Sequence, residues 1–480
     1  MSPDRPYCAC ATPPGASGLA VIRMSGKGSA EVIDRVFRIH RSADDVSSVV
    51  EMRGYTAAFG TLFDPKDNHA VDEVICTRFT APHSYTGEDS IEISCHGGFA
   101  VRQEILRVLI ENGAKAAEPG QFTRTAFLAG KIDLSQAEAV MDVISADSRL
   151  ALAAAEVQLS GALKQKIRRI SDALYQTFAS LEMMVEFPEH DDTPENLEEI
   201  LRKLTEPYQT LVDLERTFSQ GRILREGMTI VLCGIPNSGK SSLLNRLAGY
   251  DRAIVAASPG TTRDTLEVFG AIEGIPVRII DTAGLRETED TVEQLGVSRA
   301  YAAVKEADLI LWLCAPDGLD SKDNSELRSA LTEPFYGKDI GILVSKADLM
   351  DKDAADAYVM QMKDCVAAWG FADAVRFFGI FSSETGEGSD RIGEEVRKLY
   401  EEKGQGQQSQ VLLTNSRHYE KVSKAAETLA ETIAILQRGM SADVACALLR
   451  NTMEELGEIT GDCVNEELVQ MIFSRFCIGK

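Results

Sequence analysis

Runs of consecutive apolar residues are the clearest pattern in the middle of this 480-residue chain. Each run is short, rich in Val, Ile and Leu, and followed by glycine or polar residues, which is typical of buried strands. The runs are MTIVLC (228–233), VRIID (277–281), DLILWLCA (308–315), DIGILV (339–344) and RFFGIF (376–381). They predict an α/β domain that begins near residue 221 and stops near residue 400, before the linker EEKGQGQQSQ.

Apolar residues recur every three or four positions on both sides of this domain. The first helical stretch, 121–220, contains DLSQAEAVMDVISADSRLALAAAEVQLSGALKQ, and Asp133 or Ser135 can cap its start. The second, 401–480, contains ADVACALLRNTMEELGEIT and NEELVQMIFSRF, each with one apolar stripe. We predict one helical domain interrupted by an insertion, although periodicity alone also allows two unrelated helical pieces.

The first 120 residues follow a third pattern. Strand-like runs at 18–26, 73–81 and 90–96 precede a helical stretch at 99–113, which predicts a compact α+β domain. Polar loops interrupt it: PHSYTGED before a strand, HGG after that strand, and PGQFTRTAFLAGKIDL further on.

Composition narrows the class of protein. Fifty basic and seventy-four acidic residues give a net charge of -24, so we expect a more basic partner to hold most of any nucleic acid substrate. The acidic segment 182–199 is read as a solvated loop and helix start rather than a docking surface. Ten scattered cysteines suggest neither a zinc ribbon nor a disulfide scaffold. Without a signal-like N-terminus or an 18-residue apolar stretch, a cytoplasmic protein with no membrane contact is expected.

The run at 228–233 leads directly into GIPNSGKSS, a G-x-x-x-x-G-K-S phosphate-binding loop in its required context. Gly234 and Gly239 allow a tight backbone whose N–H groups point at phosphate oxygens. Lys240 is expected to reach the β- and γ-phosphates, and the Ser241 hydroxyl to ligate Mg²⁺. The helix SSLLNRLAG that follows places its positive end under the phosphates.

Three later loops complete a nucleotide site. The run at 277–281 ends in DTAG, where Asp281 would hold Mg²⁺ through water and the Gly284 N–H would sense the γ-phosphate. In GTTRD, Thr262 is a candidate Mg²⁺ ligand. Asp348 can accept two hydrogen bonds from the edge of guanine, which adenine does not offer, so the nucleotide is predicted to be GTP.

This order of loops resembles the Ras-like GTPases, with two departures. Their N-K-x-D pattern has Ser345 in place of asparagine here, which removes an amide that ties the loop to the phosphate loop and predicts looser nucleotide binding. Their catalytic glutamine after DTAG is Leu285 here. The downstream acids Glu287, Glu289 and Glu293 are candidates to replace it, and the residues alone do not choose between them.

The motifs ATPPG with IRMSG, SYTGED with HGG, PGQFTRTAFLAGKIDLSQAEAV, the GTPase loops and the terminal FCIGK, in this joint order, closely resemble the tRNA uridine-modifying GTPase family called TrmE or MnmE. The resemblance runs end to end and implies a multidomain α+β and α/β fold. It implies an N-terminal domain (1–120) that binds a tetrahydrofolate derivative and dimerises, a helical domain split into 121–220 and 401–480, and an inserted Ras-like P-loop GTPase domain (221–400).

The resemblance also implies an activity and partners. A homodimer would join a flavin-dependent partner of the MnmG (GidA) type, which supplies FAD, in a heterotetramer that acts on tRNA. Together they would add an aminomethyl or carboxymethylaminomethyl group to C5 of the wobble uridine, position 34. The one-carbon unit would come from 5-formyl- or 5,10-methylene-tetrahydrofolate.

Site residues carry over from the family position by position. The nucleotide contacts are Asn237, Ser238, Gly239, Lys240, Ser241, Ser242, Thr261, Thr262, Asp281, Thr282, Ala283, Gly284, Lys346, Asp348, Ser382 and Ser383. A K⁺ ion near the phosphates, needed when two GTPase domains meet, would be held by Asn237, Ala256, Ser258 and Thr261. Glu293 would orient the attacking water, and Arg23, Glu88, Lys131 and Lys480 would contact folate. The family's arginine-glycine pair after PPG is Ala16-Ser17 here.

The terminal FCIGK contains a cysteine, Cys477, whose role could be lipid attachment, positioning or covalent catalysis. Lipidation is disfavoured because Gly479 and Lys480 fill the last two places, where prenylation needs other residues. The segment is best read as reaching the folate site, with a positioning role for Cys477 favoured over covalent catalysis. Two other classes stay open from the residues: a ribosome-assembly or signalling GTPase with adaptor domains, and a folate-dependent methyl or formyl transferase with a regulatory GTPase.

Overall fold

The computed structural model describes residues 5–42, 45–186, 197–234, 237–248, 266–281, 302–315, 337–370, 372–404 and 411–479. The chain forms two compact units, each built from separate stretches of sequence. The first comprises Met1–Ile144, Gln158–Leu211 and Lys421–Lys480. The second comprises Ser145–Val157 and Val212–Glu420. The domain boundaries that the sequence predicts near residues 120, 220 and 400 are not tested by this division into two units, and they stay predictions.

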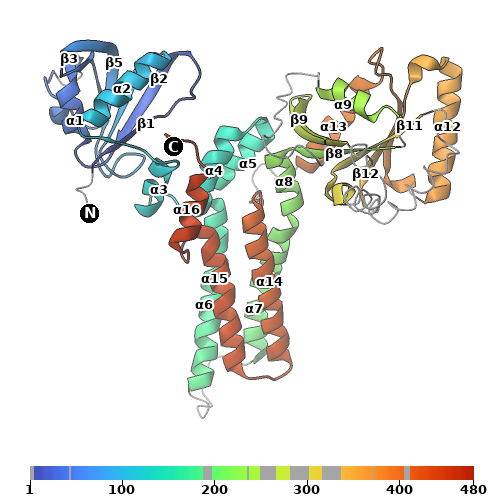
Figure 1. The fold of residues 1–480 in the computed structure, drawn as a ribbon. Helices are drawn as coiled ribbons and strands as arrows, with labels where there is room; N and C mark the ends of the chain where they lie inside the picture. Colours follow the sequence, from blue (N-terminus) through green and yellow to red (C-terminus); the bar gives the residue numbers. More distant parts are fainter. Residues whose placement is uncertain are drawn as a thin grey trace, which may run out of the picture. The chain divides into compact units, whose positions relative to one another are not determined.

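A seven-stranded sheet forms the N-terminal part of the first unit (Figure 1), in the order β3-β4-β5-β6-β2-β1-β7. Its strands are β1 (Tyr7–Cys10), β2 (Ser17–Ser25), β3 (Phe37–Ser42), β4 (Thr56–Asp64), β5 (His69–Phe79), β6 (Ser90–Gly97) and β7 (Lys115–Ala116). Neighbours pair antiparallel except β1 and β7. Helices α1 (Ser29–Val36) and α2 (Phe99–Glu111) pack on one face, where Ile22, Ile93 and Ile105 share one core. The α+β prediction is confirmed.

Helices make up the rest of the first unit, and some of them continue in sequence into the second. They are α3 (Gln121–Leu128), α4 (Leu134–Ser145), α6 (Ala162–Glu186), α7 (Leu197–Arg216), α14 (Ser416–Gln437), α15 (Ala442–Thr460) and α16 (Glu466–Ser474). Asp133 caps α4, as the sequence predicts, because its carboxylate accepts hydrogen bonds from Gln136 N at 3.0 Å and Ser135 Oγ at 2.6 Å. Helix α15 lies beside α6 (Figure 1), so segments almost 300 residues apart form one helical layer.

The second unit contains a six-stranded sheet in the order β13-β12-β11-β8-β10-β9. Its strands are β8 (Met228–Cys233), β9 (Leu266–Ile272), β10 (Ile275–Asp281), β11 (Leu309–Cys314), β12 (Asp339–Val344) and β13 (Val375–Ile380). All neighbours are parallel except β9 with β10. Its helices include α8 (Phe218–Glu226), α9 (Lys240–Ala248), α12 (Lys352–Trp369) and α13 (Ser389–Gly404). The five apolar runs are therefore confirmed as strands, and the edge strand β9 is an addition to them.

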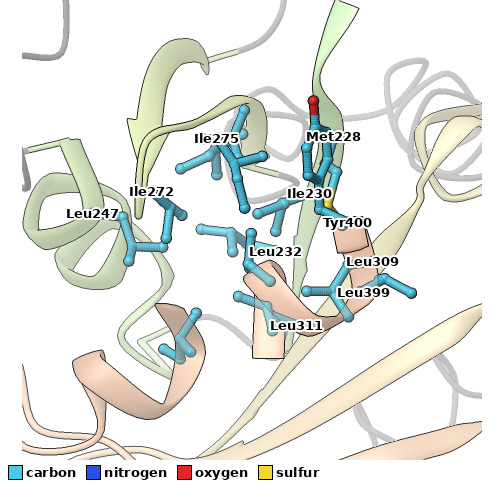
Figure 2. Packing of buried hydrophobic residues seen from close by; sticks show 14 of the residues in the cluster. Met228, Ile230, Leu232, Leu247, Ile272, Ile275, Leu309, Leu311, Leu399 and Tyr400 are labelled. Carbon is cyan, nitrogen blue, oxygen red and sulfur yellow. The ribbon is translucent and has the colours of Figure 1, made fainter. Parts of the chain in front are cut away.

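One core holds this sheet to its helices (Figure 2). Ile230 and Leu232 of β8 lie with Leu311 of β11 and Leu399 of α13, all almost fully buried. Alternate residues of the same strands form a second core on the opposite face, which includes Trp312. Because both faces are covered, the strands read as unbroken apolar runs rather than as an alternation.

The chain enters and leaves the part that contains the six-stranded sheet through adjoining segments. Thr217 Oγ1 accepts a hydrogen bond from Leu413 N at 3.0 Å, and the rings of Phe218 and Tyr419 stack at 4.3 Å. Gly221 is required here, because a Cβ would lie 2.2 Å from Leu413 O. We call Thr217, Phe218, Gly221, Leu413 and Tyr419 the neck.

The separate helix α5 (Arg149–Leu159) begins within the second unit. The hydroxyls of Ser148 and Tyr400 lie 2.7 Å apart, and Leu150 and Ala154 pack against the core of Figure 2. All ten cysteines are free thiols. No helix in the described ranges is long and apolar enough to cross a membrane.

Candidate functional site

Strand β8 delivers the phosphate loop to the carboxyl edge of the parallel sheet. Gly234 follows the strand with φ 143°, and a Cβ there would come within 2.4 Å of Leu313 O, so no other residue fits. Asn237 and Gly239 also have positive φ, 62° and 93°. The loop then turns into α9, whose first residue is Lys240. These backbone conformations produce the tight loop that the sequence predicts.

Polar groups of this loop are already brought together. Lys240 is 4% exposed, and its ammonium donates to Gly234 O at 2.6 Å. The Ser241 hydroxyl donates to Asp281 Oδ2 at 3.0 Å. Asp281 is the last residue of β10 and is fully buried. A hydroxyl beside a buried carboxylate at the end of a phosphate loop is a donor set that suits Mg²⁺, a hard cation that prefers oxygen.

Two further loops meet at the same sheet edge. After β12, Lys346 adopts φ 57° and a short 3-10 turn covers Ala347–Leu349. The Ser382 hydroxyl donates to Asp348 Oδ1 at 2.6 Å, and Ala347 N donates to Phe381 O at 3.2 Å. The Asp348 side chain therefore has a fixed direction while the residue stays exposed. This is the geometry needed for a carboxylate that accepts paired donors from a base edge.

Ser345 does not replace the missing asparagine. Its backbone N–H and its hydroxyl both donate to Cys314 O, at 2.9 and 3.2 Å. The residue is 1% exposed, and a Cβ at Gly239 would lie 3.7 Å from Ser345 Cβ and 4.0 Å from Ser345 Oγ. The hydroxyl is therefore committed to its neighbouring strand rather than to the phosphate loop.

Several predicted site residues lie outside the described residues. They are Ala256, Ser258, Thr261, Thr262, Thr282, Ala283, Gly284, Glu293 and Lys480. Of the other nucleotide contacts, Ser238 is fully buried in the loop and Ser242 is exposed on α9. Ser383 follows Ser382 directly and is half-buried.

A second polar cluster lies in the N-terminal sheet, around Glu88. The Tyr7 hydroxyl lies 3.2 Å from Glu88 Oε2 and 2.8 Å from Thr125 Oγ1. Ser25 Oγ also donates to Glu88 Oε2 at 3.2 Å and shares hydrogen bonds with Thr86 and Ser90. Burial, reinforced by the nearby Glu88 carboxylate, raises the pKa of Tyr7 to about 12, so Tyr7 stays neutral and can donate to Glu88.

Two of the three predicted folate cations, Arg23 and Lys131, lie within the described residues, and both are engaged by the protein itself. Arg23 pairs with Glu92 on the adjacent strand at 2.8 Å, and its guanidinium lies 5.3 and 5.7 Å from the ring centroids of Tyr85 and Phe122. Lys131 donates to Pro82 O at 3.0 Å and to Ser84 O. Lys131 therefore fastens the SYTGED loop that carries Glu88.

The C-terminal segment lies against this region. Gly120 N donates to Cys477 O at 3.4 Å, and Phe476 packs with Phe473 at a centroid distance of 5.1 Å. Gly479, with φ 95°, comes so near β1 that a Cβ would lie 2.2 Å from Cys10 O. Cys477 itself is exposed. The C-terminal segment therefore lies against β1 and the PGQF loop, and its predicted reach to a folate site stays a prediction.

Arg102, which helps to hold the ATPPG loop, was not predicted from the sequence. Arg102 of α2 is 5% exposed, and its guanidinium donates to Pro13 O at 2.8 Å and to Pro14 O. It thus supports the ATPPG loop from almost 90 positions away. An arginine inside an apolar helix stripe, FAVRQEILRV, was the only available signal.

A buried strand, a glycine loop, a buried lysine and a Ser–Asp pair define a P-loop GTPase, with an aspartate placed for guanine. Family models cover most of the chain: the TrmE N-terminus (described as a GTP-binding protein) matches residues 6–131, and the MnmE helical domain matches residues 134–477. The chain belongs to the MnmE family of tRNA modification GTPases.

Full-length relatives support this assignment. The tRNA modification GTPase MnmE of Acetivibrio thermocellus is 36% identical, with 100% of each chain covered. Those of Carboxydothermus hydrogenoformans and Geobacillus thermodenitrificans are each 38% identical, with 98% of both chains covered. Among solved structures, Era bound to MgGDPNP and 16S ribosomal RNA nucleotides has 23% identity and a TM-score of 0.29, over 36% of this chain and 56% of that one. That likeness is too slight to support an inference.

Proposed function

We propose that this protein hydrolyses GTP and takes part in modifying C5 of the wobble uridine, position 34, of certain tRNAs. The observation that carries the proposal is the end-to-end match to tRNA modification GTPases together with the Lys240, Ser241 and Asp281 arrangement. A ribosome-assembly GTPase with adaptor domains is not favoured, because the relatives match the flanking domains as well as the GTPase.

Within the GTPase site, Ser241 and Thr262 would hold Mg²⁺, with Asp281 acting through water. Asn237, Ala256, Ser258 and Thr261 would hold K⁺, and Glu293 would orient the attacking water. When bound, these cations supply positive charge against the charge that develops in phosphoryl transfer. The chain's own share is to position the nucleotide: Asp348 is fixed by Ser382 for guanine, and Lys240 can exchange Gly234 O for phosphate oxygens.

The cluster around Glu88 fits a folate derivative, which would supply the one-carbon unit. Tyr7 and Ser25 hold the Glu88 carboxylate, which could accept paired donors from a pterin ring. Arg23 lies over the Tyr85 ring, Lys131 binds the carbonyls of Pro82 and Ser84, and Lys480 follows Gly479, so cations are available near this loop for the glutamate tail. Cys477 is proposed to position the C-terminal segment. A flavin-dependent partner of the MnmG type, contributing FAD, would complete the reaction in the cytoplasm.

We also propose a homodimer formed through the N-terminal sheet. The face away from α1 and α2 exposes Phe59 and Ile75, which pair directly across β4 and β5, at 41% and 48%. Exposed paired apolar residues on a sheet face indicate a protein contact. Light scattering of Ile75→Glu checks this: a monomer supports the proposal, and an unchanged dimer contradicts it.

The function is tested by mass analysis of tRNA nucleosides from cells that lack the protein and are complemented. Wild type should restore C5 aminomethyl-type uridines, Asp348→Asn should not, and Asp356→Asn, an exposed change on α12, should restore them. Persistence of these nucleosides in the deletion strain would overturn the proposal and bring the ribosome-assembly alternative forward.

A further inference from the structure

Helix α6 begins with an unusual charge pattern for this acidic chain. Residues 164–169 read KQKIRR, and no other six-residue stretch of the sequence holds four Lys or Arg. From Ala162 to Leu181 the helix carries a single acid, Asp172, whereas the whole protein has a net charge of -24. A local positive surface is therefore maintained against the overall charge, and such a surface attracts polyanions.

The fold directs these charges outward. Leu163, Ile167, Ile170, Leu174, Thr177 and Leu181 form the buried stripe of α6. The opposite face exposes Gln165, Arg168, Arg169, Asp172, Tyr175 and Gln176. We call Arg168, Arg169, Asp172 and Tyr175 the α6 face. It spans about two turns of helix, or roughly 11 Å, on the helix drawn beside α15 in Figure 1.

The two arginines of the α6 face are not used by the protein. Throughout the described ranges, Arg168 and Arg169 have neither a hydrogen bond nor an ion-pair partner. Asp172, one turn further along the helix, pairs with neither arginine in the described ranges, and the next acid, Glu182, is paired with Arg450 of α15 at 3.5 Å. Most other arginines of this unit are engaged, as Arg102 and Arg107 show. Unpaired guanidinium groups are suited to phosphate oxygens, which they bind in a bidentate manner.

Tyr175 adds an independent observation. It lies seven residues after Arg168, on the same side of the helix, and is 63% exposed. Its ring meets Phe178 edge-on at 6.4 Å, which supports it while leaving one face open. An exposed aromatic ring next to free cations is the combination on which nucleic acid bases stack while phosphates are neutralised.

We propose that the α6 face binds tRNA, with Arg168 and Arg169 contacting backbone phosphates and Tyr175 stacking on a base or sugar. This inference rests on the proposed function, from which it takes the tRNA substrate. It assigns a direct RNA contact to the helical domain of this chain, so the basic partner does not hold the substrate alone.

The test is equilibrium binding of labelled bulk tRNA to the full-length protein across a salt series. The slope of log K against log salt is negative, and each lost phosphate contact reduces its magnitude by about 0.7 to 0.9. The double variant Arg168→Gln/Arg169→Gln should therefore reduce the magnitude of the slope by about 1.4 to 1.8. It should also weaken binding at 0.15 M salt by about 10- to 30-fold. Arg202→Gln, an exposed arginine on α7 with acidic neighbours, is the matched control and should change neither quantity.

Two single changes separate the contributions. Tyr175→Ala should weaken binding about fivefold or more without altering the slope, because stacking releases no counterions. Asp172→Asn should tighten binding, because it removes the one negative charge of the α6 face. GTP hydrolysis without tRNA should be the same in all variants, which shows that they fold.

The outcomes are distinct. If the wild-type protein shows no salt-dependent binding of tRNA, the tRNA part of the proposed function is wrong. Normal wild-type binding with an unchanged slope in the double variant overturns only this inference. Lost tRNA modification with unaltered tRNA affinity would overturn it too, because the α6 face would then dock a protein.

Discussion

Replacing Ser345 by asparagine should tighten nucleotide binding, because it would restore a link between the base loop and the phosphate loop. In this structure the Ser345 hydroxyl donates to Cys314 O, which also receives the Ser345 backbone N–H. If the hydroxyl is lost, Cys314 O therefore still accepts a hydrogen bond from the backbone N–H of residue 345. An asparagine side chain is longer and would extend toward the loop at Gly239, which Ser345 already faces.

The magnitude follows from one net hydrogen bond inside a buried site. Position 345 is 1% exposed, and a new neutral hydrogen bond is worth about 1 kcal/mol, which corresponds to roughly fivefold in affinity. We expect Ser345→Asn to bind GDP and GTP about fivefold more tightly, mainly through slower release. A fluorescent guanine nucleotide, titrated at equilibrium and then chased with unlabelled GTP, measures both.

Ser345→Ala is the control for this change. It keeps the backbone hydrogen bond to Cys314 O and adds no amide, so its affinity should equal that of the wild type. Equal affinities in Ser345→Asn and the wild type would refute the idea that the substitution loosens the nucleotide. Tightening in Ser345→Ala as well would show that the space beside Gly239, not the missing amide, sets the affinity.

Three other predictions concern turnover, the C-terminal thiol and pH. Glu293→Ala should abolish GTP hydrolysis but leave nucleotide affinity intact, and normal turnover would exclude Glu293 as the residue that orients water. Cys477→Ser should support full tRNA modification in complemented cells; loss of modification at normal protein levels would instead make the thiol a reactant. Burial would raise the pKa of Glu455, but hydrogen bonds from Lys421 and Lys424 outweigh it and lower the pKa below 4.5. This carboxylate therefore stabilises the fold above pH 4.5 and stops doing so as pH falls further, so the Tm deficit of Lys421→Met should be present at pH 7 and shrink by pH 3.5.

Apolar runs were sufficient to predict the GTPase sheet. Strands that are buried on both faces consist almost entirely of apolar residues, so each strand stands out as one run in the sequence. Strand β9 was missed because it is an edge strand, where Glu267 and Gly270 interrupt the apolar run. The phosphate loop could be predicted because its chemistry is contiguous in sequence. Here local spacing and three-dimensional proximity coincide.

Contacts between distant segments could not be predicted. Arg23 meets Glu92 only because β2 and β6 pair in one particular register. Lys131 was predicted as a folate cation, but its ammonium also holds the carbonyls of the loop before Glu88. A motif indicates which side chains matter, whereas the pairing of strands and loops decides what each one touches. The folate roles of Arg23 and Lys131 therefore stay predictions.

The neck makes the GTPase domain removable. Because Thr217 and Leu413 are hydrogen-bonded to each other, the two cut ends of the chain already adjoin, and a few residues could bridge them. A shortened protein lacking residues 218–412 would join α7 almost directly to α14. Leu150 and Ala154 would then lose the core they pack against and become exposed. Truncation therefore needs two polar substitutions at these positions to keep the remaining half in solution, and on that half the proposed RNA and folate sites can be studied without GTP.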